Sequence, residues 1–270
     1  MAILFSGDFH ANKTRELNSI TEKTLLEKHG RELYNSIKYH IILGDAGFMR
    51  HDNGEKDMRN YKALARRPFP ILCVLGEGEP VYGMKDILEV DIGLGETVYQ
   101  INAEPFVAYL KRGKVYTIDG IRFLVLGGAL SKDKDRRKNE NKWWKMEYWT
   151  EQEKQDLFKL LETEYFDYVI SHTGPHHINK KLFEHENPDS QKLKDEVAFL
   201  NDEIHNRIQF CEWLCGHWHR DEYYFDEEAE HGYHYLYRKT KVLVLEEDGG
   251  MTIYHENQYE FLKKYFIRKE

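Results

Sequence analysis

Short apolar runs that end beside a polar residue recur five times along the chain, and this pattern predicts five β-strands. The runs cover residues 2–5, 41–43, 71–75, 168–171 and 213–216. Each run is followed, directly or after one or two small residues, by an aspartate, a glutamate or a histidine. Open α/β sheets bind ligands at the carboxyl ends of their strands, so these polar residues are the first candidates for a site.

The spacing of apolar residues between these runs predicts helices. Apolar residues recur at helical spacing from residue 19 to residue 38, although Gly30 weakens the middle of that segment. Thr150 opens a capping-box signature for a helix that ends near Glu164. Residues 190–207 form a further helical segment, which we interpret as an insertion.

Further strands are expected in the middle and at the end of the chain. Asp119-Gly120 predicts the turn of a hairpin between residues 115–118 and 121–126, and a charged loop over residues 131–142 follows. The segment 233–254 is also typical of strands. No internal repeat or linker separates these elements, and the candidate ligands are spread over most of the chain. We therefore expect one domain over residues 1–270, with its motifs in residues 3–219 and C-terminal strands and a tail in residues 220–270.

Composition narrows the functional class. Hydrophobic residues make up 41% and charged residues 32% of the 270 residues, as in soluble globular proteins. A formal net charge of -8 argues against a broad grip on a nucleic acid backbone, so long nucleic acid is not the expected partner. Three cysteines suggest free thiols in a reducing compartment. No apolar stretch reaches the ~18 residues of a membrane span, and we expect a cytoplasmic protein without a membrane partner.

The residues at the strand ends are carboxylates and imidazoles, which suit a pair of divalent metal ions. Two ions ~3.5–4 Å apart need a shared carboxylate and several further oxygen or imidazole ligands. One histidine alone is more often a surface residue, but the coincidence of several at strand ends favours a metal site. Manganese, iron, zinc and nickel all accept such ligands. The candidates are Asp8, His10, Asp45, His172, His217 and His219.

Four motifs over residues 3–219 together resemble the calcineurin-like metallophosphoesterase superfamily. The motifs are Gly7-Asp8-Phe9-His10, Gly44-Asp45, Ser171-His172 and Gly216-His217-Trp218-His219. The resemblance implies an α/β (α+β) fold, with a two-sheet β-sandwich flanked by helices. It implies two divalent metal ions, with manganese favoured, and a metal-bridging hydroxide that attacks phosphorus. By motif position, the first metal would be held by Asp8, His10 and His219, the second by His172 and His217, and both by Asp45.

The third motif departs from the family. The family has Gly-Asn-His followed by an acidic residue, whereas this chain has Gly76-Glu77-Gly78-Glu79. Glu77 stands where an asparagine ligates the second metal, and a carboxylate oxygen is still a good ligand. Gly78 stands where the family has a histidine thought to act as a general acid. Loss of a general acid typically costs ~10²–10⁴ in rate, so we expect reduced activity.

Residues outside the motifs offer weaker candidates for substrate binding. Arg137 lies in a basic loop that could gather phosphate, although interleaved acidic residues also fit an ordinary solvated loop. His176, His177 and His51 could enter the site in place of the absent histidine, or could be loop residues. Trp149 is expected to pack under the helix that follows it.

Three functions remain open from the sequence. The leading hypothesis is a phosphoesterase for a phosphomonoester or small phosphodiester, whose substrate would be a small molecule, a nucleotide or a phosphoprotein. The alternative is an inactive metal-binding protein, natural or engineered, that binds a phosphorylated partner. The third is a nuclease, which the negative net charge disfavours.

Overall fold

The computed structural model of the chain describes most of its residues. It describes residues 1–10, 20–47, 59, 61–62, 66–77, 79, 87–100, 106–131, 134–139, 143, 145–246, 249–256 and 258. The predictions made for Gly78 and His51 lie outside the described residues.

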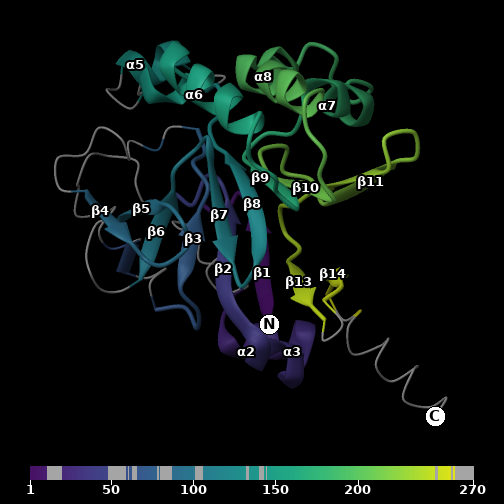
Figure 1. Ribbon diagram of the computed structural model, residues 1–270. Helices are drawn as coiled ribbons and strands as arrows, with labels where there is room; N and C mark the ends of the chain where they lie inside the picture. Colours follow the sequence, from purple (N-terminus) through teal and green to yellow (C-terminus); the bar gives the residue numbers. More distant parts are fainter. Residues whose placement is uncertain are drawn as a thin grey trace.

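Two β-sheets pack face to face, which confirms the predicted two-sheet sandwich (Figure 1). The first sheet has the strand order β14 (Met251–His255), β13 (Lys241–Leu245), β1 (Ala2–Gly7), β2 (Ile37–Leu43), β3 (Ile71–Cys73), β6 (Val107–Leu110), β5 (Thr97–Gln100) and β4 (Leu88–Asp91). The second has the order β11 (Glu222–Asp226), β12 (His231–Tyr235), β10 (Glu212–Cys215), β9 (Tyr168–Ser171), β8 (Ile121–Leu126) and β7 (Lys114–Ile118).

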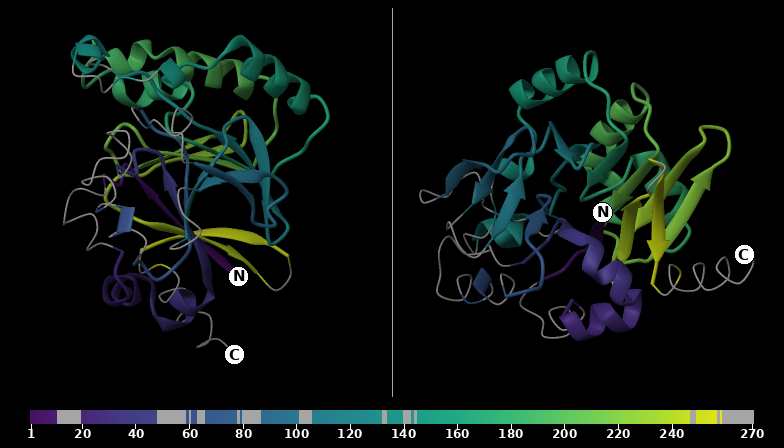
Figure 2. Two further views of the ribbon diagram at one scale, coloured as in Figure 1. Left: turned by 90° about the vertical axis from the view of Figure 1, so that its left-hand side faces the viewer. Right: turned by 60° about the horizontal axis from the view of Figure 1, so that its bottom comes forward.

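Helices cover the outer faces of both sheets. The helices are α2 (Glu22–His29), α3 (Arg31–Ser36), α5 (Lys134–Asn139), α6 (Glu151–Leu161), α7 (His176–Phe183) and α8 (Glu196–His205), with 3-10 turns η2 (Lys145–Glu147) and η3 (Gln191–Lys194). Figure 2 shows α2 and α3, in purple, on the opposite side of the molecule from the teal and green helices α6, α7 and α8. Among the described residues, the longest apolar helices still fall short of what a bilayer crossing requires.

Side chains along each central strand alternate between the core that lies between the two sheets and a core beneath the covering helices. In β1, Ile3 and Phe5 pack between the sheets, whereas Leu4 packs under Leu25 of α2. In β10, Trp213 packs beneath the helices of the second sheet. Successive residues of a strand point to opposite faces, so a strand that is buried on both faces must be apolar throughout. This explains the uninterrupted apolar runs in the sequence.

The helix predicted from residue 19 to residue 38 is wrong in its extent. Gly30 has φ +79° and donates its N–H to the carbonyl of Leu26, which ends α2, and α3 begins at the next residue. The segment then enters β2 at Ile37, so the last predicted helical residues lie in a strand. Positive φ is the ordinary conformation of a glycine that ends a helix, and it overrides the helical periodicity.

Other elements agree with the sequence in part. The hairpin with its turn at Asp119-Gly120 and the C-terminal strands are confirmed. Trp149 is buried beside Leu157 of α6, as expected. The helix begun by Thr150 ends at Leu161, a few residues early, and the segment 190–207 forms η3 and α8 rather than one helix. The loop predicted over residues 131–142 contains the short helix α5.

Candidate metal centre

The candidate ligands follow the carboxyl ends of parallel strands in both sheets. In the first sheet β1, β2 and β3 are parallel neighbours, and in the second sheet β9 and β10 are parallel neighbours. Because the sheets face each other, loops that lie far apart in the sequence meet at one edge of the sandwich. Open sheets bind ligands at such an edge.

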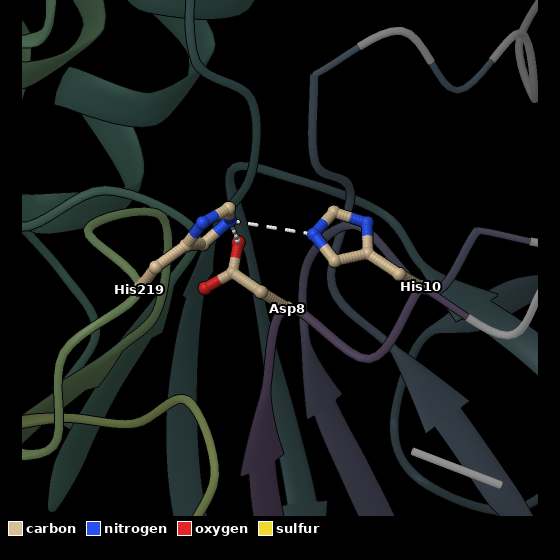
Figure 3. Close-up of side chains that lie close together, drawn as sticks. All are labelled: Asp8, His10 and His219. Carbon is tan, nitrogen blue, oxygen red and sulfur yellow. Dashed lines mark hydrogen bonds and ion pairs between the residues drawn. The ribbon is translucent and has the colours of Figure 1, made fainter. Parts of the chain in front are cut away.

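The first ligand group consists of Asp8, His10 and His219, whose ligand atoms all lie within 4.8 Å of one another. His10 Nε2 lies 3.3 Å from His219 Nε2, and His219 Nε2 lies 3.6 Å from Asp8 Oδ1. Figure 3 shows the two imidazole rings pointing toward each other, with the Asp8 carboxylate beside His219. One carboxylate and two imidazoles at this spacing suit a divalent transition metal.

The second ligand group consists of Asp8, Asp45 and His172, also within 4.8 Å of one another. Asp45 lies between the two groups: its Oδ1 is 3.9 Å from His172 Nε2, and its Oδ2 is 3.8 Å from His10 Nδ1. Two carboxylates therefore connect the groups. Asp8 belongs to both, and the two oxygens of Asp45 face histidines of different groups.

Buried polar atoms in these groups fit a bound cation. Asp8 Oδ2 and His172 Nε2 are buried, and neither has a hydrogen-bond partner among the described residues. Such atoms are costly to bury unless something binds them. Burial, followed by the nearby charge of Asp45, raises the pKa of Asp8 well above its usual value. Burial lowers the pKa of His172 to about 4, so its imidazole is neutral at pH 7, as a ligand must be.

The backbone at the candidate ligands adopts a rare conformation. Six non-glycine residues in the described part of the chain have positive φ, and four of them are candidate ligands: His10 (45°), Asp45 (47°), His217 (65°) and His219 (54°). Residues with side chains seldom adopt this region, and such strain clusters at functional sites. These loops therefore hold their candidate side chains in place at the expense of backbone strain.

Two glycines permit the loops to approach each other. A Cβ at Gly44 would lie 2.1 Å from His172 Nδ1, and a Cβ at Gly216 would lie 2.8 Å from Asp8 Oδ2. Both distances are too short for real carbon atoms. Gly44 and Gly216 are therefore needed for the two sheets to bring these residues together.

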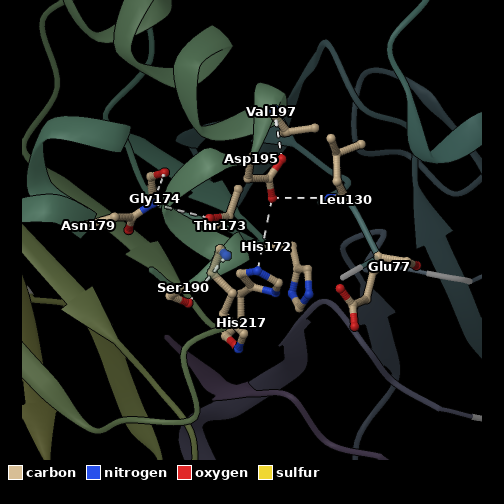
Figure 4. Close-up of polar contacts among 12 residues, drawn as sticks. Glu77, Leu130, His172, Thr173, Gly174, Asn179, Ser190, Asp195, Val197 and His217 are labelled. Atoms are coloured by element: carbon tan, nitrogen blue, oxygen red, sulfur yellow. Dashed lines mark hydrogen bonds and ion pairs between the residues drawn. The ribbon is translucent and has the colours of Figure 1, made fainter. Parts of the chain in front are cut away.

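His217 lies next to the second ligand group without belonging to it. Its ring centroid is 4.9 Å from that of His172, and its Nε2 faces Asp195 Oδ2 at 4.0 Å. Asp195 caps α8, because its Oδ1 accepts the N–H of Val197 at 2.8 Å (Figure 4). Its Oδ2 accepts the N–H of Leu130 at 3.1 Å. The Asp195 carboxylate therefore places a negative charge beside the His217 ring.

Glu77 and Arg137 form an ion pair beside these groups. Arg137 Nη2 donates to Glu77 Oε1 at 3.2 Å, and Glu77 belongs to neither ligand group. Burial and the charge of Asp45 raise the pKa of Glu77 to about 7, against the opposing effect of Arg137. Glu77 thus lies among the acidic groups of the site, and Figure 4 shows it beside His172. Arg137 contacts Glu77 from α5.

Glu79, the other carboxylate of the third motif, has a structural role. Glu79 accepts hydrogen bonds from the N–H of Gly76 at 2.9 Å, the N–H of Gly47 at 3.2 Å and the hydroxyl of Tyr109 at 3.2 Å. These bonds join the loops that follow β2 and β3. Glu79 therefore holds the positions of Asp45 and Glu77 relative to each other.

His176 lies at the first turn of α7, outside both ligand groups. Its ring packs against Phe199 of α8, with the ring centroids 4.1 Å apart. Its neighbour His177 pairs through Nδ1 with Asp202 Oδ1 at 2.7 Å. Neither contact connects these histidines with the ligands, so a role for His176 in binding substrate stays a prediction.

Sequence reasoning missed Lys192 and Asp195, which come from the segment interpreted as an insertion. Lys192 Nζ donates to the main-chain carbonyl of His217. The signal for Asp195 was present in the sequence as an aspartate before an apolar helical segment, a usual N-cap. No local signal places either residue next to His217, because that contact depends on how the insertion folds back.

Comparison with known proteins gives likeness in fold. No family model and no curated protein matches the sequence. The phosphopantetheinyl hydrolase PptH from Mycobacterium tuberculosis gives a TM-score of 0.49 at 12% identity, covering 88% of this chain and 90% of PptH. Another solved structure gives 0.50 at 11% identity, covering 94% of this chain and 98% of the other. The sulfate thiohydrolase SoxB from Thermus thermophilus, in complex with glycerol, gives 0.38 at 12% identity, covering 96% of this chain and 40% of SoxB.

Proposed function

We propose that this chain is a calcineurin-like metallophosphoesterase that binds two divalent metal ions, with manganese favoured, and hydrolyses a phosphomonoester or a small phosphodiester. The observation that carries the proposal is the pair of ligand groups that share Asp8, with the two oxygens of Asp45 facing both. Likeness to structures of hydrolases is in keeping with it, although at such identities the likeness concerns the fold alone.

The proposed ligands differ in charge and in protonation state, and each kind has its own role in binding metal. Asp8 and Asp45 would supply the negative charge that holds two cations close together, and His172 would supply a neutral imidazole nitrogen. Glu77 and His217 would complete the second ion's ligands, as motif position implies. When bound, the two ions would lower the pKa of a water molecule and neutralise charge on the phosphoryl group.

The reaction is proposed to be slow for substrates with basic leaving groups. Gly78 offers no side chain to protonate the departing oxygen, and neither His176 nor His177 lies in the ligand groups. The second candidate function, a metal-loaded protein that binds a phosphorylated partner without turnover, follows from this same absence.

The test is to load the purified full chain with manganese and to measure bound metal by mass spectrometry, together with hydrolysis of nitrophenyl phosphate and bis-nitrophenyl phosphate. We expect two ions per chain and metal-dependent hydrolysis, both reduced in Asp45→Asn. Two bound ions without hydrolysis of either ester would favour the binding protein. A chain that binds no divalent metal would contradict both functions.

A further inference from the structure

We propose that Lys192 binds the phosphoryl group at this site and that, with Arg137, it selects dianionic phosphomonoesters over monoanionic phosphodiesters. The inference rests on the proposed function, because it assigns the substrate class of the same site. Neither the ligand motifs nor the strand ends contain Lys192, which comes from η3 in the segment between α7 and α8.

The structure fixes Lys192 against the ligand loop that contains His217. Ser190 Oγ accepts the N–H of Lys192 at 3.4 Å and so caps η3, and Leu193 is buried beneath the helices. The Lys192 ammonium donates to the carbonyl of His217 and lies 5.7 Å from the centre of the Trp218 ring. A lysine held at its backbone and at its ammonium is ordered before any substrate binds, which reduces the entropic cost of binding.

The loop that Lys192 contacts is the one that brings two histidines to the site. His217, whose carbonyl accepts from Lys192, has its ring centroid 4.9 Å from that of His172. His219, two residues further along the same loop, belongs to the first ligand group. A phosphoryl group bound at the ligand groups would therefore come within reach of this ammonium.

Arg137 approaches the same site from a separate segment. Its guanidinium pairs with Glu77 at 3.2 Å from α5, whereas Lys192 comes from η3. The fold therefore supplies the two cations to the site independently. Arginine and lysine are the side chains that bind phosphate oxygens best, the first through a fork of donors and the second as a point charge.

The charge of the site explains why a dianion would be preferred. Three carboxylates, Asp8, Asp45 and Glu77, nearly offset two divalent ions, and Lys192 and Arg137 add two positive charges. A phosphomonoester brings two negative charges and three terminal oxygens, whereas a diester brings one charge and two such oxygens. Hydrogen bonds between charged groups are the strong ones, so loss of one to the third oxygen should weaken binding roughly ten- to a hundredfold.

The alternative role for Lys192 is structural, since it could serve only to hold the carbonyl of His217. The test must therefore separate substrate binding from the integrity of the ligand loop. We would compare Lys192→Met and Lys192→Arg with the native full chain, and use Lys194→Met as a matched control. Lys194 lies in the same 3-10 turn, but it is exposed.

Each manganese-loaded protein would be titrated calorimetrically at pH 8 with inorganic phosphate, a dianion, and with dimethyl phosphate, a monoanion. We expect Lys192→Met to weaken phosphate binding at least tenfold and dimethyl phosphate binding less than threefold, with unchanged metal content. Lys192→Arg should recover most of the difference, and Lys194→Met should match the native chain.

Equal weakening of both anions, unchanged binding of both, or loss of metal in Lys192→Met would overturn the proposal. Absence of phosphate binding by the native loaded chain would also overturn it. A native chain that binds phosphate through Lys192 but hydrolyses no ester would support the role of Lys192 and refute the proposed hydrolysis, so the two failures are distinguishable.

Discussion

The Nδ1–H of His172 donates a hydrogen bond to the main-chain carbonyl of Leu43 at 3.0 Å. This bond joins the end of β9 in the second sheet to the end of β2 in the first. Because it places the proton on Nδ1, it leaves the lone pair of Nε2 facing Asp45 at 3.9 Å. This contact between the two sheets therefore also leaves His172 Nε2 with the lone pair that a metal ligand needs.

Replacement of His172 should remove the second metal ion and leave the first. We expect His172→Gln to bind one divalent ion per chain and to lose at least ~100-fold in kcat/KM. Substitution of a residue that only hydrogen-bonds to a metal ligand already costs roughly 10–100-fold in metal affinity or activity, and loss of a ligand itself should cost at least as much. Metal analysis and nitrophenyl phosphate hydrolysis would measure both. His177→Gln is the control, because that histidine is exposed and pairs with Asp202. Two bound ions in His172→Gln would exclude His172 as a ligand.

Asp195 should affect metal affinity and helix stability separately. Asp195→Ala removes the cap of α8 and should destabilise the fold by ~1 kcal/mol, as capping residues do. Asp195→Asn keeps an oxygen for the cap but removes the charge that faces His217. We expect both variants to bind metal 10- to 100-fold more weakly, with only the alanine variant less stable. Chelator competition and urea unfolding in EDTA would measure the two effects, and unchanged metal affinity in both variants would make Asp195 only a cap.

The sequence alone could single out the candidate ligands because each motif is local. Asp8 and His10, or His217 and His219, are two residues apart, and a glycine precedes each pair. Strand ends could therefore be recognised from apolar runs alone. The sequence did not show that Asp8 would belong to both ligand groups, because that depends on the angle at which two sheets meet.

Elements without a clear apolar pattern were missed. β4 is largely exposed, with Leu88 51% accessible, so its residues do not alternate between core and solvent. Gly30 broke a helix whose periodicity continued past it, because a positive φ costs glycine little. Lys192 reaches His217 across 25 positions of the chain, and no rule of local spacing predicts such a contact.

Acid should destabilise the metal-free fold in part through His29. This side chain is 1% exposed, contacts Thr240 Oγ1 through Nε2 at 2.8 Å, and has a pKa lowered by burial to about 4. Between pH 4 and about 6.5 the unfolded chain binds a proton that the folded chain does not, so stability falls as the pH falls through this window.

The His29 contribution can be isolated by comparison with His29→Gln, in which an amide can still contact Thr240 but does not titrate. From pH 7.5 to pH 5 the native chain should lose about 2 kcal/mol more than the variant. Urea unfolding in EDTA would measure the difference without interference from metal binding. Parallel pH profiles would show that His29 does not titrate across this range.

Giving the chain the third motif of the metallophosphoesterases that its sequence resembles should supply leaving-group assistance. Glu77→Asn combined with Gly78→His would place an amide and an imidazole where those proteins have them. We expect hydrolysis of alkyl phosphates to rise ~10²–10⁴-fold, the usual contribution of a general acid. Nitrophenyl phosphate should gain much less, because its leaving group departs without a proton.

Each single substitution separates one part of this effect. Glu77→Asn removes the partner of Arg137 without supplying an acid, so it should not raise the rate on alkyl phosphates. Gly78→His should raise that rate by itself, although by less than the double substitution if Glu77 weakens the second ion as a Lewis acid. kcat/KM on both ester classes in manganese would measure this. Equal rates of the native chain on both classes would show that no acid is missing, and no gain in the double variant would favour a protein that binds phosphorylated partners without cleaving them.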